Sequence, residues 1–169
     1  MIILAEMSRI SQDALFRAIA AVQKMDSAQK IQLADEIFVS QPNMLGSFLV
    51  LSTLGVPTKK TSLALDTLLL CFQAMKESGL RWPVITEDDL ERQSARTTAI
   101  LKFYDSFSDE NLRKSSALQY IDDHTEKELF AWVITMCKDW LQSVSPEETD
   151  KYVIHVAVNL VNCVASVSM

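Results

Sequence analysis

Apolar residues recur at intervals of three and four along most of the chain, which is the period of an amphipathic helix and not of a strand. The pattern is clearest over residues 146–167, which are rich in valine. The apolar positions there are Val153, Ala157, Leu160, Val161, Val164 and Val167. A polar stripe of the same period runs beside them and consists of His155, Asn159, Asn162 and Ser166. The pattern predicts a helix, because β-branched side chains lower helix propensity only slightly.

Signals for the start of a helix precede several of these periodic segments. Ser11, Asp26 and Thr86 each stand where a side-chain oxygen can accept a hydrogen bond from the first helical turn. Residues 125–128 have the Thr-x-x-Glu pattern of a capping box, which predicts a helix that begins there. The Ser-Pro-Glu-Glu sequence at 145–148 predicts the start of the last helix, because it combines an N-cap, a proline and acidic residues.

Two of the three glycines predict helix ends. In Gly55-Val56-Pro57 the glycine can adopt the left-handed conformation, the valine can pack back on the helix, and the proline prevents its continuation. Gly79 ends the next helical segment, which runs from about Thr58 to Ser78, in the same way. The third glycine, Gly46, lies inside a helical segment, where it indicates a close approach of two backbones.

These signals predict an all-α fold, a compact single-domain bundle of about eight helices over residues 1–169. Most neighbouring helices are expected to pack antiparallel, because the connections are short. Residues 43–54 and 126–142 are apolar nearly all round, which predicts that these two helices lie at the centre. The first two helices are expected to turn an apolar face to the core, formed by Leu15, Phe16, Ile19 and Val22 and by Ile31, Ala34, Ile37 and Phe38. No repeat of 34 or 40-odd residues indicates a solenoid.

Composition narrows the class of protein further. Three glycines and four prolines are too few for the turns of an all-β domain or for the glycine-rich loops of a nucleotide-binding fold. A hydrophobic content of 49% with 22% charged residues is not that of a disordered chain. The net charge of −6 repels phosphate backbones, so the sequence does not favour nucleic-acid binding.

The cysteines and the apolar segments indicate the compartment. Cys71, Cys137 and Cys163 are far apart and lie among apolar residues, which predicts buried free thiols in a reducing environment. Residues Met1–Glu6 lack the basic start and the long apolar run of a signal peptide. No apolar stretch approaches the ~18 residues of a membrane span. We therefore expect a cytoplasmic protein that does not enter the membrane.

No motif in the sequence points to a catalytic, cofactor or metal site. Neither His124 nor His155 has a glutamate three residues before it, as a di-iron helical bundle requires. Residues 122–126 carry three acids around His124, but they lie where one helix ends and the next begins, so capping and solvated charge explain them. We therefore expect no catalytic residues, no cofactor and no metal, and the sequence does not favour an enzyme.

One segment resembles a known DNA-binding motif. Residues 54–62, Leu-Gly-Val-Pro-Thr-Lys-Lys-Thr-Ser, are similar to the turn of a helix-turn-helix unit, and the resemblance extends over 47–68. It implies that the second helix of this unit reads DNA. The sequence departs from the motif at Thr61, where the family has an apolar anchor, and over 63–72, which are too apolar for a groove. Lys59 and Lys60 form an isolated basic pair.

Four residues are candidates for a ligand site or an interface. Trp82 lies in a short loop bounded by proline, and tryptophan is over-represented at interfaces. Arg92 can bind an anion or pair with an acid one turn away, such as Asp88. His155 and Asn159 belong to the polar stripe, which is solvated, buried or part of a pocket.

The leading hypothesis is a non-catalytic module that acts by contact with a protein partner or by self-association, because two helices are nearly all apolar. The alternative is a small-molecule-binding protein or an enzyme with a pocket between helices, formed by Trp82, Arg92, His155 and Asn159. DNA binding at 47–68 is the third hypothesis.

Overall fold

The structure, a computed structural model, describes residues 8–169, so the expectation drawn from Met1–Glu6 lies outside the described part. Residues 8–169 form eight α-helices, one short 3₁₀-helix and no strand, which confirms the predicted all-α bundle. The helices are α1 (Gln12–Lys24), α2 (Ser27–Ser40), α3 (Pro42–Thr53), α4 (Ser62–Glu77), α5 (Glu87–Asp105), α6 (Glu110–Asp123), α7 (Lys127–Ser143) and α8 (Asp150–Ser166). The 3₁₀-helix η1 (Thr58–Lys60) lies between α3 and α4.

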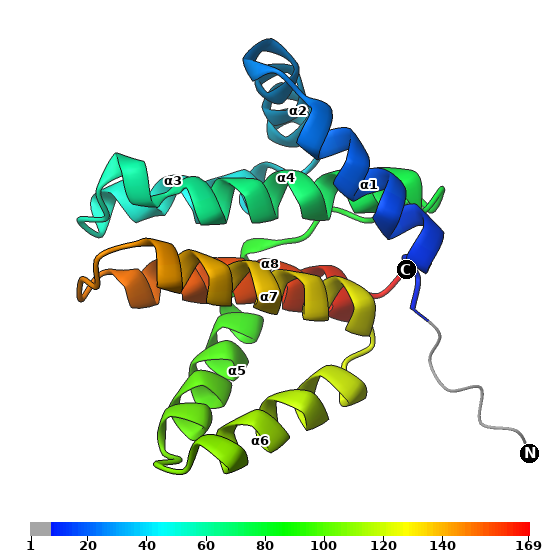
Figure 1. Cartoon of the computed structure of the whole chain (residues 1–169). Coiled ribbons are helices and arrows are strands. Elements are labelled where there is room, and N and C mark those ends of the chain that lie inside the picture. Colours follow the sequence, from blue (N-terminus) through cyan, green and yellow to red (C-terminus); the bar gives the residue numbers. More distant parts are fainter. Residues whose placement is uncertain (1–7) are drawn as a thin grey trace, which may run out of the picture.

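Helices α4 and α8 form the centre of the bundle. Each of them buries eleven residues, and the two helices pack against each other. In Figure 1, α3 and α4 lie together above α7 and α8, with α1 and α2 at the top and α5 and α6 forming a V at the bottom. The core extends from α4 and α8 into most of the surrounding helices, whereas α6 contributes no buried residue.

The choice of central helices from the sequence needs correction. The segment 43–54 corresponds to α3, of which only Met44 and Leu51 are buried. The segment 126–142 corresponds to α7, which buries five residues and packs beside α8. Leu49 and Val50 of α3 are exposed, because the contacts of α3 with α2, α4 and α8 leave one side of the helix uncovered. An apolar circumference therefore did not identify the helix at the centre.

The bundle consists of two halves, α1 to α4 and α5 to α8, and the four helices of each half contact one another in a similar pattern. Helix α1 packs on α4 as α5 packs on α8, and α2 packs on α3 as α6 packs on α7. Between the halves, α3 contacts α8 and α7 contacts α4, so these contacts are reciprocal. Reciprocal contacts are the property of two similar units related by an approximate two-fold axis. In Figure 1 the first half, α1 to α4, lies above the second half, α5 to α8.

The two halves begin with similar residues. The sequence Ile-Ser-Gln-Asp at 10–13 opens the first half, and Ile-Thr-Glu-Asp at 85–88 opens the second. Ser11 and Thr86 occupy the N-cap positions of α1 and α5, and Ile10 and Ile85 are both buried. The two halves therefore open on the same local pattern, a buried isoleucine followed by a hydroxyl N-cap.

A buried polar side chain in each half holds the opening segment of the other half. Gln41, between α2 and α3, accepts a hydrogen bond from Ile85 N at 2.9 Å and donates one to Pro83 O at 2.9 Å. Glu126, between α6 and α7, accepts hydrogen bonds from Arg9 N at 2.7 Å and Ile10 N at 3.4 Å. Burial raises the pKa of the Glu126 carboxyl above its ordinary value. These two side chains join the halves at equivalent places.

Three predicted helix starts are confirmed. The side chains of Ser11, Asp26 and Thr86 accept hydrogen bonds from backbone N–H groups three residues later. In α2 and α5 the capping is reciprocal, because the side-chain oxygens of Gln29 and Asp89 accept hydrogen bonds from the backbone N–H groups of Asp26 and Thr86. Local sequence therefore determines where these helices begin.

The predicted start of α7 is correct to one residue but its predicted capping box is absent, and the predicted start of α8 is wrong. Helix α7 begins at Lys127 without a side-chain cap, because the carboxylate of Glu126 binds the segment before α1 instead. Helix α8 begins at Asp150 and not at 146. Asp150 accepts a hydrogen bond from Glu147 N at 3.0 Å and forms a buried ion pair with Lys60 at 2.8 Å. These partners hold residues 145–149 outside the helix.

The glycines and the apolar faces differ in part from the predictions. Gly55 and Gly79 have φ angles of 81° and 73°, which confirms the left-handed helix ends. Gly46 does not serve a close approach of two backbones, because a side chain there would meet nothing within 4 Å. The predicted core faces of α1 and α2 are wrong at three residues that are more than half exposed: Phe16, Ile31 and Phe38.

Candidate ligand cavity

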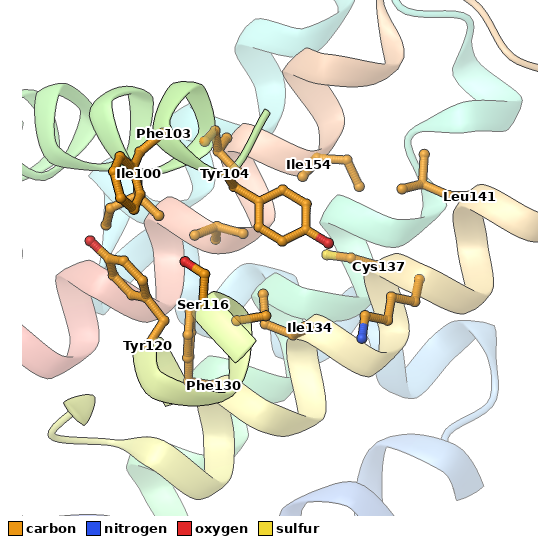
Figure 2. A pocket seen from close by; sticks show the side chains of 14 residues that line it. Ile100, Phe103, Tyr104, Ser116, Tyr120, Phe130, Ile134, Cys137, Leu141 and Ile154 are labelled. Atoms are coloured by element: carbon orange, nitrogen blue, oxygen red, sulfur yellow. The ribbon is translucent and has the colours of Figure 1, made fainter. Parts of the chain in front are cut away.

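An apolar cavity lies between the α5–α6 pair and the α7–α8 pair. Its volume is about 170 Å³, and it opens toward solvent. Figure 2 shows side chains of all four helices turned toward this space. The residues that line it are Ile100, Leu101, Phe103 and Tyr104 of α5, Ser116, Ala117 and Tyr120 of α6, Phe130, Ile134, Cys137, Lys138 and Leu141 of α7, and Ile154 and Val158 of α8.

The cavity lies beside a helix, α6, that contributes no fully buried residue to the core, although Ile121 packs against it. The equivalent helix of the first half, α2, has the same length and buries Leu33 and Ile37, its seventh and eleventh residues. The seventh and eleventh residues of α6 are Ser116 and Tyr120, neither of which is buried. A serine therefore stands where the first half has a leucine, and the missing volume contributes to the cavity.

The polar groups of the lining are few, and Lys138 is its single charged residue. Hydroxyl groups come from Tyr104, Tyr120 and Ser116, which Figure 2 shows beside the apolar side chains. Cys137 lines the cavity as well, and burial raises the pKa of its thiol to about 12. The thiol is therefore protonated at neutral pH and is not a nucleophile.

Tyr104 is held between α5 and α6 by an arginine. The guanidinium of Arg113 lies over the Tyr104 ring, 5.8 Å from its centroid. Arg113 is itself fixed by a hydrogen bond from its Nε to Phe107 O at 2.7 Å. The attraction between this cation and the ring keeps the Tyr104 side chain in place beside the cavity.

A chain of buried hydrogen bonds joins α5 and α8 next to the cavity. The hydroxyl of Thr97 donates to Asn159 Oδ1 at 3.0 Å and accepts from Asn162 Nδ2 at 3.0 Å. Asn159 Nδ2 donates to Leu90 O at 3.3 Å. Asn162 Oδ1 lies 3.0 Å from His124 Nε2. Each buried polar group of Thr97, Asn159 and Asn162 thus has a partner, so the chain fixes how α5 sits on α8.

His124 connects this chain to the wall of the cavity. Its Nδ1 accepts a hydrogen bond from Glu126 N at 3.0 Å, so the proton of the neutral ring lies on Nε2 and is donated to Asn162. Burial lowers the pKa of His124, which favours this neutral form. The ring is stacked on Phe130 with centroids 4.3 Å apart, and Phe130 lines the cavity.

The four candidates from the sequence do not converge on this cavity. Asn159 is buried in the hydrogen-bond chain, and half-buried His155 lies 2.9 Å from the Ser94 hydroxyl through its Nε2. Arg92 is exposed and pairs with Asp89 at 3.4 Å, one residue later than the expected partner. Trp82 is half-buried against the core, and its indole N–H has no hydrogen-bond partner within residues 8–169. The structure thus places His155 and Asn159 against α5, through Ser94 and Leu90 on either side of Arg92 in the sequence.

The segment that resembles a helix-turn-helix unit comprises the end of α3, η1 and the start of α4. Helix α4 is one of the two central helices, so its residues face other helices. Lys60 is buried and bonded to Asp150 at 2.8 Å and to Glu147 at 3.2 Å. Burial lowers the pKa of Lys60, but the hydrogen bonds and charges of these two carboxylates outweigh it, so the net pKa is raised. Lys60 therefore pairs with carboxylates of the protein itself, and not with the DNA phosphates that the helix-turn-helix hypothesis would require.

The cysteines have the predicted environment. Cys71, Cys137 and Cys163 are all buried and free. Burial raises the pKa of each thiol to about 12. Within residues 8–169, no group of three or more histidine, cysteine, aspartate or glutamate residues could hold a metal ion. Among the helices of that part of the chain, none is both long enough and apolar enough to cross a membrane.

Sequence analysis missed the cavity and its lining. The sequence carries no direct signal for it, because aligning 10–13 with 85–88 does not pair Leu33 with Ser116, and that comparison needs the helix starts at Ser27 and Glu110. Comparison of the chain with protein-family models, with curated proteins and with solved structures found no match. The cavity and its neighbours are therefore the basis of the functional proposal.

Proposed function

We propose that the protein is a non-catalytic binding protein that holds a small apolar molecule between the α5–α6 pair and the α7–α8 pair. The observation that supports this most directly is the cavity of about 170 Å³ with its largely apolar lining. Cavities between the helices of a bundle, lined by apolar and aromatic side chains with a few polar groups, are typical ligand sites. The protonated thiol of Cys137 supports binding over covalent chemistry.

The α5–α6 pair suits this function because a ligand can complete its packing. Helix α6 buries none of its own residues, and Phe103 and Leu118 of this pair are more than half exposed. An apolar molecule in the cavity would contact α5, α6 and α7 at once and remove apolar surface from water. Ligand binding is therefore expected to stabilise the fold in proportion to ligand concentration.

Titration with toluene tests the proposal. We expect toluene to shift the backbone amide resonances of lining residues and to raise the Tm. Ser116→Leu introduces into the cavity a side chain like that of Leu33 at the equivalent position of α2. This variant should show neither the shifted resonances nor the higher Tm. Ser115→Leu is the matched control, because Ser115 is exposed and does not line the cavity. Unchanged resonances in the wild-type protein, or equal binding by the Ser116→Leu variant, would contradict the proposal.

Protein binding is a second candidate, and the exposed apolar residues of α2 and α3 favour it. They are Ile31, Phe38, Val39, Leu49 and Val50, with Leu54 at the end of α3. Exposed apolar surface of this kind marks contact sites when it is contiguous. Light scattering across a range of concentrations tests self-association. A mass that rises with concentration, and that Phe38→Ser returns to the monomer, would support it. A monomeric mass at every concentration would exclude it.

A further inference from the structure

The size of the cavity limits the ligand to about one ring. An engineered cavity of ~150 Å³, lined by leucine, isoleucine and phenylalanine, binds benzene. The cavity of this protein has nearly the same volume, about 170 Å³. The enclosed part of a ligand is therefore limited to about a single six-membered ring with one substituent, and any longer portion would extend through the opening into solvent.

The walls of the cavity favour an aromatic ring over an aliphatic one. Phe103, Tyr104, Tyr120 and Phe130 contribute four aromatic side chains to the lining. Figure 2 shows their rings arranged around the space from three different helices. Aromatic pairs in offset or edge-to-face geometry gain energy beyond the area that they bury. A ring in the cavity can reach such geometry with several of these side chains.

The charges around the cavity favour an anionic substituent. Lys138 is the single charged residue of the lining, and no carboxylate is part of it. The hydroxyl of Tyr104, whose ring lies under Arg113, adds a hydrogen-bond donor to the lining. Within residues 8–169, Lys138 forms no ion pair of 4.0 Å or less. Both the lysine and the tyrosine hydroxyl can therefore interact with an incoming acid.

We infer that the cavity binds a single-ring aromatic carboxylate, with its ring against the aromatic walls and its carboxylate toward Lys138 and the Tyr104 hydroxyl. This inference rests on the proposed function and adds the chemical class of the ligand. The net charge of the protein is −6, so the preference for an anion arises locally, from Lys138, and opposes the overall field.

Three probes of one ring each test the class: benzoate, benzyl alcohol and benzylamine, titrated at pH 7 and followed by amide chemical shifts. We expect benzoate to bind about threefold more tightly than either of the others, which is the gain of one exposed ion pair. Lys138→Met should remove this preference. Lys114→Met, an exposed lysine of α6 outside the lining, should preserve it. Higher salt should reduce the preference, since it screens exposed charges.

The outcomes separate the ligand class from the proposed function. Equal binding of all three probes, or tighter binding of benzylamine, would overturn the aromatic acid and leave the apolar binding function intact. Absence of binding by all three probes and by toluene would overturn both. Benzoate binding that persists in Ser116→Leu would place the acid elsewhere on the protein and would also overturn the inference.

Discussion

Thr97 is the residue on which the buried hydrogen-bond chain between α5 and α8 depends. Its hydroxyl is both the donor to Asn159 and the acceptor from Asn162, and the side chain is fully buried. The sequence identified Asn159 and Asn162 as part of a polar stripe but did not indicate that a threonine of another helix would satisfy them. A periodic pattern shows which residues share a face, whereas their partners depend on how the helices pack.

Replacing Thr97 with valine tests how much this chain of hydrogen bonds contributes to stability. Thr97→Val keeps the shape but leaves Asn159 Oδ1 and Asn162 Nδ2 without that partner, so we expect a loss of about 1–3 kcal/mol in the free energy of unfolding. Thr67→Val is the matched control, since Thr67 is equally buried and its hydroxyl bonds to Leu63 O within its own helix. Urea unfolding measures both. Equal costs for the two variants would contradict a special role for Thr97.

At the scale of the element, local sequence explains some helix boundaries and distant contacts explain the others. Ser11, Asp26 and Thr86 cap their own helices, so the sequence alone located these starts. The start of α8 was predicted four residues early, because Asp150 is bound to Lys60 of η1. A start that depends on a partner in another element cannot be found from the residues beside it.

Replacing Gly46, inside α3, and Gly55, just after the end of α3, with alanine should change the stability of the protein in opposite directions. Gly46 lies within α3 with open space around it, so Gly46→Ala should stabilise the protein by about 0.5–1 kcal/mol. Gly55 has a φ of 81°, which alanine adopts only with strain, so Gly55→Ala should destabilise by about 1 kcal/mol. Thermal unfolding of both variants gives the signs. Equal signs would contradict the backbone explanation.

At the scale of the whole molecule, the fold class followed from helix periodicity, but the two-half arrangement and the cavity did not. Helix α6 appears in the sequence as one more amphipathic helix, with Leu112, Leu118 and Ile121 as its apolar residues. In the structure Leu112 and Leu118 are exposed and Ile121 is half-buried. Whether such residues reach the core depends on the angle at which α6 leaves α5, and a periodic pattern carries no information on that angle.

The stability of the whole molecule should fall as the pH drops from 7.5 to 5.5. Burial lowers the pKa of His124 and of His155 below 6.5 in the folded protein, so the unfolded chain binds more protons in this range. The stabilisation is fully present above the ordinary histidine pKa and decreases below it. In His124→Gln the free energy of unfolding should therefore fall less steeply with decreasing pH than in the wild type. The difference in slope is at most about 1.4 kcal/mol per pH unit, because one histidine binds one proton.

Urea unfolding at several pH values measures this dependence. Glu126 is a carboxyl beside His124 whose pKa is raised by burial, so its contribution has to be separated from that of the histidine. Glu126→Gln therefore serves as the control: it should lower stability, yet leave the slope between pH 6.5 and 7.5 unchanged. A slope that is the same in the wild type and His124→Gln would contradict the assignment to His124.

The position of α8 in the chain has a consequence for protein synthesis. Helix α4 ends at Glu77 and its central partner α8 begins at Asp150, so the ribosome completes α4 about 70 residues before α8 starts to emerge. At about 5–20 residues per second, the apolar side of α4 waits for several seconds without the helix that covers it. The core can close only after translation has passed α8. The nascent first half is therefore the form in which this protein is most exposed to aggregation and to chaperones.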